Sequence, residues 1–119
     1  MAKSVLVLIT KPPYGLEEAF AGSRLALGMV SSGNVEQCNL LLIGDGTLNA
    51  VATQRPDALR MPSNMEALQD MNDMEFKVFC IKQDLDERAP GSEVLNFVEM
   101  IDWEVARKII EEHQMVTTF

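Results

Sequence analysis

Apolar and polar positions occur along the chain in blocks that predict strands and helices in alternation. Residues 4–9, with the sequence SVLVLI, form one apolar run, and residues 36–43 contain a second, LLLI. Strands that are buried on both faces have continuous runs of this kind, and they are typical of a parallel sheet covered by helices. We therefore expect the first two strands in these two segments.

Two further segments carry apolar residues at helical spacing. Residues 16–31 predict a first helix, in which Leu25 and Met29 lie off the main apolar stripe. An apolar surface of that breadth indicates a second buried face, which we interpret as a subunit contact. A second helix is expected to begin near Pro62. We interpret its apolar stripe as core, with a soft binding surface as the alternative. The stripe contains Met61, Met65, Leu68 and Met71.

The last third of the chain continues the alternation. We expect a strand at residues 94–98, a helix at residues 103–113 that is capped by Asp102, and a closing strand at residues 114–119. On a helical wheel the apolar and charged residues of this helix separate cleanly. That separation predicts a helix packed on one side and solvated on the other. The apolar arc contains Trp103, Val105, Ala106, Ile109 and Ile110.

Residues 75–88 are the stretch around which the rest is arranged. Their first half is aromatic and β-branched, which predicts a short buried strand, and residues 82–88 predict a short helix. Cys80 lies at the changeover. Strands and helices therefore alternate from end to end. This alternation predicts a single α/β domain, residues 1–119, with a mostly parallel five-stranded sheet.

Composition and charge narrow the class of protein. Hydrophobic residues occupy 47% of the 119 positions, which is enough for a packed core without disulfides. The formal net charge of −8 argues against direct binding to nucleic acid or to an anionic membrane, because both attract clusters of Lys and Arg. The apolar runs are too short to span a membrane, and the first residues lack the pattern of a secretory signal. We therefore expect a cytoplasmic protein.

Cysteine and histidine usage limits the chemistry. Two cysteines without a CxxC pair indicate free thiols in a reducing compartment. Cys38 begins the second strand and is expected to be buried and inert. His113, the one histidine, argues against a zinc site, and we expect it to pack at the end of the last helix. Neither a phosphate loop nor a GxSxG segment occurs, so no nucleotide cofactor or esterase site is predicted.

Cys80 is the candidate catalytic residue. A thiol at a strand-to-helix junction lies at the sheet edge where α/β proteins bind ligands, and it faces the positive end of a helix dipole. Both features favour a reactive thiolate, with Lys82 and Arg88 as supporting cations. Asp84 and Asp86 act in the opposite direction, since nearby carboxylates raise a thiol pKa. The alternative is that Cys80 is a small buried hydrophobe.

Three short segments resemble a known family. Residues 11–15 (KPPYG) follow the first predicted strand, residues 44–46 (GDG) follow the second, and residues 115–119 (MVTTF) form the last. Each resembles the corresponding segment of the DsrE/DsrF-like proteins, most closely the DsrF/TusC branch. The resemblance extends over nearly the whole length of the chain.

A fourth segment, residues 79–88, resembles a different branch of the same family. In the DsrE/TusD branch this segment carries a sulfur-accepting cysteine, followed some residues later by Arg-Gly. Cys80 matches the cysteine and Arg88 matches the arginine, whereas Ala89 stands in place of the glycine. The chain thus combines segments similar to both branches.

This resemblance implies a flavodoxin-like, Rossmann-type three-layer fold, and assembly into homo-oligomers or complexes with paralogous chains. It also implies a sulfurtransferase-type persulfide relay with no metal or organic cofactor. In such a relay Cys80 would take sulfane sulfur from a donor protein and pass it to an acceptor protein. The alternative within the same fold is a non-catalytic assembly subunit or a small-ligand binding module, in which Cys80 is merely packed.

Overall fold

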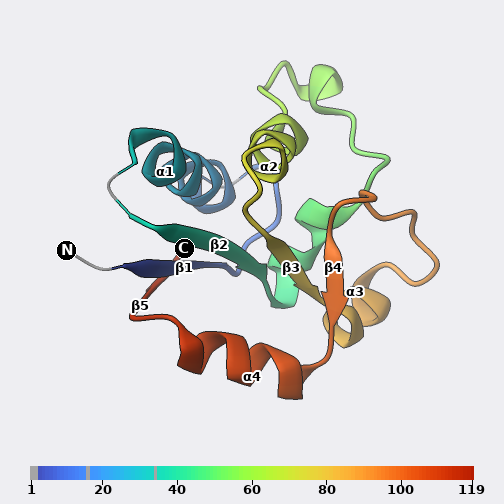
Figure 1. Cartoon of the computed structure of the whole chain (residues 1–119). Helices are drawn as coiled ribbons and strands as arrows, with labels where there is room; N and C mark the ends of the chain where they lie inside the picture. The colour runs from blue at the N-terminus through green and yellow to red at the C-terminus, as the bar shows by residue number, and fades with distance from the viewer. Residues whose placement is uncertain (1–2, 16, 34) are drawn as a thin grey trace.

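Five parallel strands form one sheet in the computed structural model, which describes residues 3–15, 17–33 and 35–119 (Figure 1). The order across the sheet is β4-β3-β2-β1-β5, and neighbouring strands all run parallel. The expected parallel five-stranded sheet is therefore confirmed. The strands are β1 (Ser4–Ile9), β2 (Gln37–Leu42), β3 (Val78–Ile81), β4 (Glu99–Ile101) and β5 (Met115–Thr118).

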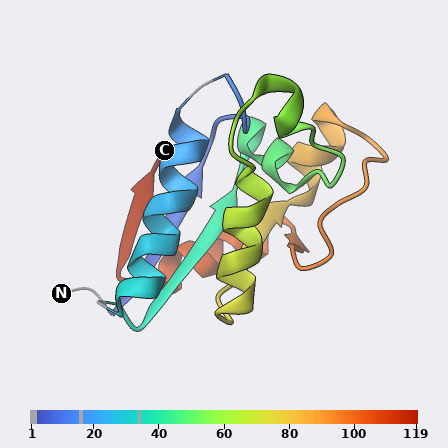
Figure 2. The same ribbon diagram turned by 90° about the horizontal axis from the view of Figure 1, so that it is seen from above.

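Helices cover both faces of the sheet and give the expected three-layer arrangement (Figures 1 and 2). Two of them, α1 and α2, lie on one face, whereas α4 crosses the other face from the end of β4 to the start of β5. The short α3 directly follows β3 and packs beside the 3₁₀ segment η1. The helices are α1 (Glu18–Ser32), α2 (Asn64–Asp73), α3 (Lys82–Arg88) and α4 (Trp103–Glu112), and the 3₁₀ segments are η1 (Gly44–Ala50) and η2 (Pro56–Leu59).

Alternate residues of the three central strands, β1, β2 and β3, point into two separate layers of core. The larger cluster includes Val5 and Val7 of β1 and Leu40 and Leu42 of β2, and it lies between the sheet and the α1–α2 layer. The smaller cluster lies between the sheet and α4, and no other helix of the described residues lies on that face. Its buried members are Leu6, Leu41, Phe79, Ile81 and Ala106.

The predicted strand at residues 94–98 is wrong. This segment is a loop, and the strand begins after it at Glu99. Val94 forms an isolated antiparallel bridge with Val51, and Leu95, Phe97 and Val98 pack against the larger core cluster. The segment is therefore apolar because its side chains pack on the core from a loop, and not because its backbone belongs to the sheet.

The buried face of α1 consists of small residues. Residue 16, at which this helix was predicted to begin, lies outside the described residues. Gly22 allows the ring of Phe119 to pack closely, since an added Cβ would meet that ring at 3.1 Å. Two residues of α1, Leu25 and Met29, were expected at a subunit contact. Leu25 is exposed and stays available for one, whereas Met29 packs in part against the core. The buried residues are Ala19, Gly22, Ser23 and Ala26.

The methionine stripe of α2 is core, as expected. Leu68 and Met71 are buried, while Met65 and the preceding Met61 are half-buried. The stripe therefore packs toward the sheet most closely in the second half of the helix.

The outer layer formed by α4 is less covered than its amphipathic pattern predicts. Its cap is confirmed, because the backbone N–H of Val105 donates to Asp102 Oδ1 at 2.9 Å. Ala106 is buried, but Trp103 is 45% exposed and Val105 is 40% exposed. The expected packed side is therefore formed by Ala106, Ile109 and Ile110, whereas Trp103 and Val105 at the margins of the arc stay exposed.

Candidate functional site at the carboxyl edge of the sheet

Three chain segments meet at the carboxyl edge of the sheet: the turn after β1, η1 after β2, and α3 after β3. Cys80 is the third residue of β3 and pairs in register with Leu42 of β2. Side chains of paired residues point to the same face, so the thiol faces the α1–α2 layer, as Leu42 does. The candidate thiol therefore lies beneath the edge and not at its surface.

Burial keeps the Cys80 thiol protonated. The residue has an exposed fraction of 0% and belongs to the larger core cluster. Desolvation, with smaller contributions from Asp84 and Asp86, raises the pKa of Cys80 to about 12. In this structure the Cys80 thiol therefore lacks both the access and the lowered pKa that a reactive thiolate needs. Strand alternation directs the side chain into the core, and the charges that act on it are those of carboxylates.

The two expected supporting cations are engaged elsewhere. Lys82 Nζ forms an ion pair with Asp86 at 3.0 Å. Arg88 Nε donates to Asp45 Oδ1 at 2.7 Å, and its Nη1 donates to the carbonyl of Asp84 at 3.1 Å. The hydrogen bond to Asp45 raises the pKa of Arg88, which stays cationic. Both cations thus neutralise carboxylates of α3 and η1 and leave the thiol without a cationic partner among the described residues.

Polar contacts join α3 to η1 at two points, which gives the GDG segment a structural role. One contact is the hydrogen bond that the backbone N–H of Gly44 donates to Asp84 Oδ2 at 2.8 Å, and the other is the ion pair of Arg88 with Asp45. Gly44 has a positive φ of 55°, a region that glycine enters readily. An added Cβ on Gly46 would overlap the carbonyl of Ile9, so only glycine fits there.

Two buried asparagines hold the turn that follows β1. Asn49 Nδ2 donates to the Lys11 carbonyl at 3.1 Å, and Asn64 Nδ2 donates to the Pro13 carbonyl at 2.9 Å. Arg24 Nη1 donates in turn to Asn64 Oδ1 at 2.8 Å. These contacts fix the KPPYG segment against η1 and α2. No motif in the sequence marks either asparagine, so they were not among the expected site residues.

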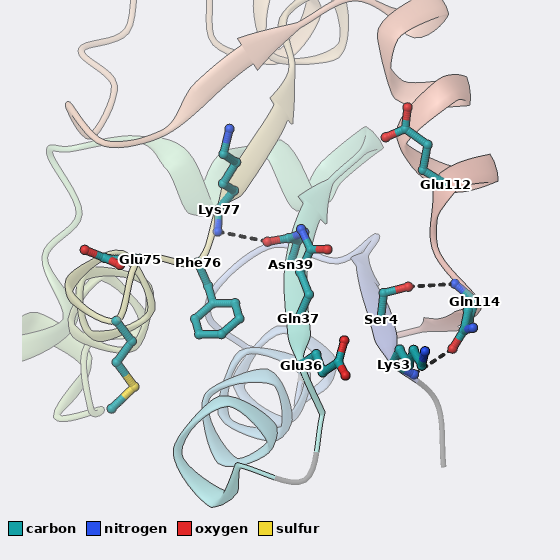
Figure 3. A pocket seen from close by; sticks show the side chains of 11 residues that line it. Lys3, Ser4, Glu36, Gln37, Asn39, Glu75, Phe76, Lys77, Glu112 and Gln114 are labelled. Atoms are coloured by element: carbon teal, nitrogen blue, oxygen red, sulfur yellow. Dashed lines mark hydrogen bonds between the residues drawn. The ribbon is translucent and has the colours of Figure 1, made fainter.

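A pocket of about 680 Å³ opens at the opposite, amino edge of the sheet (Figure 3). Its polar groups bind one another: the N–H of Gln114 donates to Ser4 Oγ at 3.0 Å, and the N–H of Lys3 donates to Gln114 Oε1 at 2.6 Å. Acidic and basic side chains are mixed, so the pocket favours no one sign of ligand charge. It is lined by Lys3, Ser4, Glu36, Gln37, Asn39, Met74, Glu75, Phe76, Lys77, Glu112 and Gln114.

His113 belongs to this amino edge, half-buried after the end of α4. Its Nδ1 lies 2.6 Å from the carbonyl of Ile109 and therefore carries the proton, which leaves Nε2 to accept from Asn39 Nδ2 at 3.0 Å. The expected packed histidine is thus confirmed. Cys80 lies at the opposite edge, so the two do not form a Cys–His couple.

The described residues contain no group of three or more His, Cys, Asp or Glu side chains that could hold a metal ion. Among the same residues, no helix combines the length and the apolar character that crossing a membrane requires.

Comparisons with known proteins agree with the fold. No match was found among curated proteins. Among solved structures, the ychN protein from E. coli superposes with a TM-score of 0.86 at 22% identity over 100% of both chains. A conserved protein of unknown function from Bacteroides thetaiotaomicron gives 0.71 at 12% identity over 98% of this chain and 95% of the other. At such identities these structures establish the fold alone.

The sequence profile of one family covers residues 3–115, which is nearly the whole chain. That match agrees with the short segments after β1 and β2 and with the parallel sheet order. The chain therefore belongs to the DsrE/DsrF-like family.

Proposed function

We propose that this chain is a non-catalytic subunit of the sulfur-relay type, which acts through contacts with other chains and not through a sulfur-carrying thiol. The observation that carries the proposal is the complete burial of Cys80. A carrier thiolate has to reach the sulfane sulfur of a donor persulfide to form the new S–S bond, as the donor thiolate leaves. A side chain with no exposed surface makes that approach only if the surrounding core opens.

The ionisation state of Cys80 supports the same proposal. With a pKa of about 12, a fraction on the order of 10⁻⁵ of the thiol is ionised at pH 7, against on the order of 10⁻² for an unperturbed thiol. The thiolate is the attacking species, so the rate of attack falls with that fraction even before access is considered.

The exposed position at the junction of β3 and α3 belongs to a different residue. Lys82 is the first residue of α3, and its side chain is 65% exposed. Cys80 precedes it by two positions and lies within the strand. A cysteine introduced at position 82 would therefore meet the access requirement that Cys80 does not meet.

Intact-mass measurement after incubation with inorganic polysulfide tests the proposal. We expect no added sulfur on the native chain or on Cys38→Ser, and one added sulfur atom on Lys82→Cys, whose thiol is exposed. In urea both native thiols should react, which shows that the reagent is competent. One sulfur atom on the folded native chain and on Cys38→Ser, but absent from Cys80→Ser, would overturn the proposal and assign the carrier role to Cys80.

A further inference from the structure

The apolar side of α4 is larger than the sheet beneath it covers. Trp103 and Val105 are both exposed, although they belong to the apolar arc of the helix. Figure 1 shows α4 alone on its face of the sheet, so no other described helix packs over its outer side. Tryptophan is among the residues that most often anchor protein–protein contacts, so the exposed side of α4 around Trp103 is a candidate interface.

A pocket of about 400 Å³ lies on one flank of the helix. It is lined by Trp103, Glu104, Arg107 and Ile110, and we call this surface the α4 flank. Trp103 and Ile110 lie two helical turns apart, roughly 10 Å along the axis. The flank is therefore an apolar strip with one acidic and one basic side chain beside it.

Neither charged residue of the α4 flank has a partner within the described part of the chain. Glu104 and Arg107 form no ion pair there, whereas Lys77, Lys82 and Arg88 each lie within 4.0 Å of a carboxylate. The flank is also locally neutral, although the chain as a whole carries −8. Local neutrality allows two copies of so acidic a chain to approach each other at this surface.

We infer that the α4 flank is the contact surface for a second copy of this chain, with the two α4 helices antiparallel about a two-fold axis. In this arrangement Trp103 of one copy lies over Ile110 of the other, and Glu104 lies opposite Arg107. Each contact then occurs twice, as a two-fold interface requires. A strip that carries both an acid and a base is complementary to itself in just this orientation.

The same charges argue against other occupants of the α4 flank. An anionic membrane attracts helices whose polar side is rich in Lys and Arg, whereas acids outnumber bases on the polar side of α4. A strongly basic partner would leave Arg107 facing like charge. The charged residues of the helix are Glu104, Arg107, Lys108, Glu111 and Glu112.

This inference rests on the proposed subunit role and names a second copy of the chain as the partner. Its test measures association, so its result does not depend on the result of the thiol assay. Sedimentation equilibrium gives the dimer constant, and emission of Trp103, the single tryptophan, should shift to shorter wavelength as dimers form. We expect Glu104→Arg and Arg107→Glu each to weaken association roughly tenfold, and the double exchange to restore it to within about threefold.

Lys108→Glu is the matched control, because it makes the same change of charge on the same helix outside the α4 flank. It should leave the dimer constant within about threefold of the native value. Circular dichroism establishes that each variant is folded. A native chain that stays monomeric at its highest soluble concentration would overturn the inference. So would a Lys108→Glu variant as weak as Arg107→Glu, or a double exchange that fails to restore association.

Discussion

Asn39 connects three elements through one buried amide. Its exposed fraction is 2%, its Oδ1 accepts from the backbone N–H of Lys77 at 3.0 Å, and its Nδ2 lies 3.0 Å from His113 Nε2. The residue therefore joins β2 to the start of β3 (Figure 3), and through His113 it joins β2 to the end of α4. A buried polar group with all its partners in place makes a specific contact that an apolar side chain of the same size would not make.

Removing this amide should be costly. Asn39→Ala leaves the N–H of Lys77 without its acceptor and opens a small cavity, so we expect the free energy of unfolding to fall by about 2–3 kcal/mol in urea titration. Gln37→Ala, on an exposed residue of the same strand, should change it by less than about 0.5 kcal/mol. Equal losses from the two variants would contradict the connecting role of the amide.

Cys80 illustrates how far residue-level reasoning reaches from sequence alone. The changeover was predicted at the right place, since β3 ends at Ile81 and α3 begins at Lys82. The face on which the thiol lies could not be predicted, because residues 78–81 are apolar throughout and are all buried. A strand buried on both faces has no polar alternation to distinguish its two sides.

The partners of the charged residues were hidden for a different reason. Asp84 binds a backbone N–H 40 positions earlier, and Arg88 binds a carboxylate 43 positions earlier. Such contacts depend on which strands are neighbours, and strand order is not encoded in any local pattern. Local reasoning therefore assigned Arg88 to the thiol that lies close to it in sequence.

At the scale of elements, α4 depends on its cap because only Ala106 of the helix is fully buried. Asp102→Ala removes the acceptor for the N–H of Val105, and we expect a loss of about 1 kcal/mol in the free energy of unfolding. Asp102→Asn retains an acceptor at the same place and should lose only a few tenths of that amount. Chemical denaturation followed by circular dichroism measures both, and equal losses would show that charge and not capping matters.

Some elements were predicted at their exact bounds, whereas one predicted strand is a loop. The strand at residues 4–9 and the helix at residues 82–88 match the structure at both ends. The failure at residues 94–98 arose because a loop packed on the core is as apolar as a short strand. Burial is a property of the fold, and an apolar run reports burial without specifying which backbone conformation achieves it.

At the scale of the whole molecule, the alternation of elements predicted the layers but not their arrangement. The pairing of β1 with β5 joins Val5 to Met115, nearly the full length of the chain apart. It requires α4 to cross the whole sheet (Figure 1). This long return places α4 as the one helix of the described residues on that face, and the exposure of its apolar Trp103 and Val105 follows from this topology.

Two thiols sealed in the larger core cluster also make the stability of the whole molecule depend on pH. Desolvation raises the pKa of Cys38 to about 11, and desolvation together with Asp84 and Asp86 raises that of Cys80 to about 12, both from 9.0. Below pH 9 the thiols are protonated in both the folded and the unfolded chain, so they add nothing to the dependence of stability on pH. Above it the unfolded chain releases protons that the folded chain retains, so stability falls as pH rises.

The slope has an upper limit of about 1.4 kcal/mol per pH unit for each thiol. We expect the native chain to lose stability more steeply than Cys38→Ala/Cys80→Ala between about pH 9 and pH 11. Urea titration at several pH values measures both, and their other ionisable groups are the same, so the difference between the curves isolates the thiols. If the two curves of stability against pH were parallel, the thiols would ionise in the folded chain as readily as in the unfolded chain. That result would contradict the burial on which the subunit proposal rests.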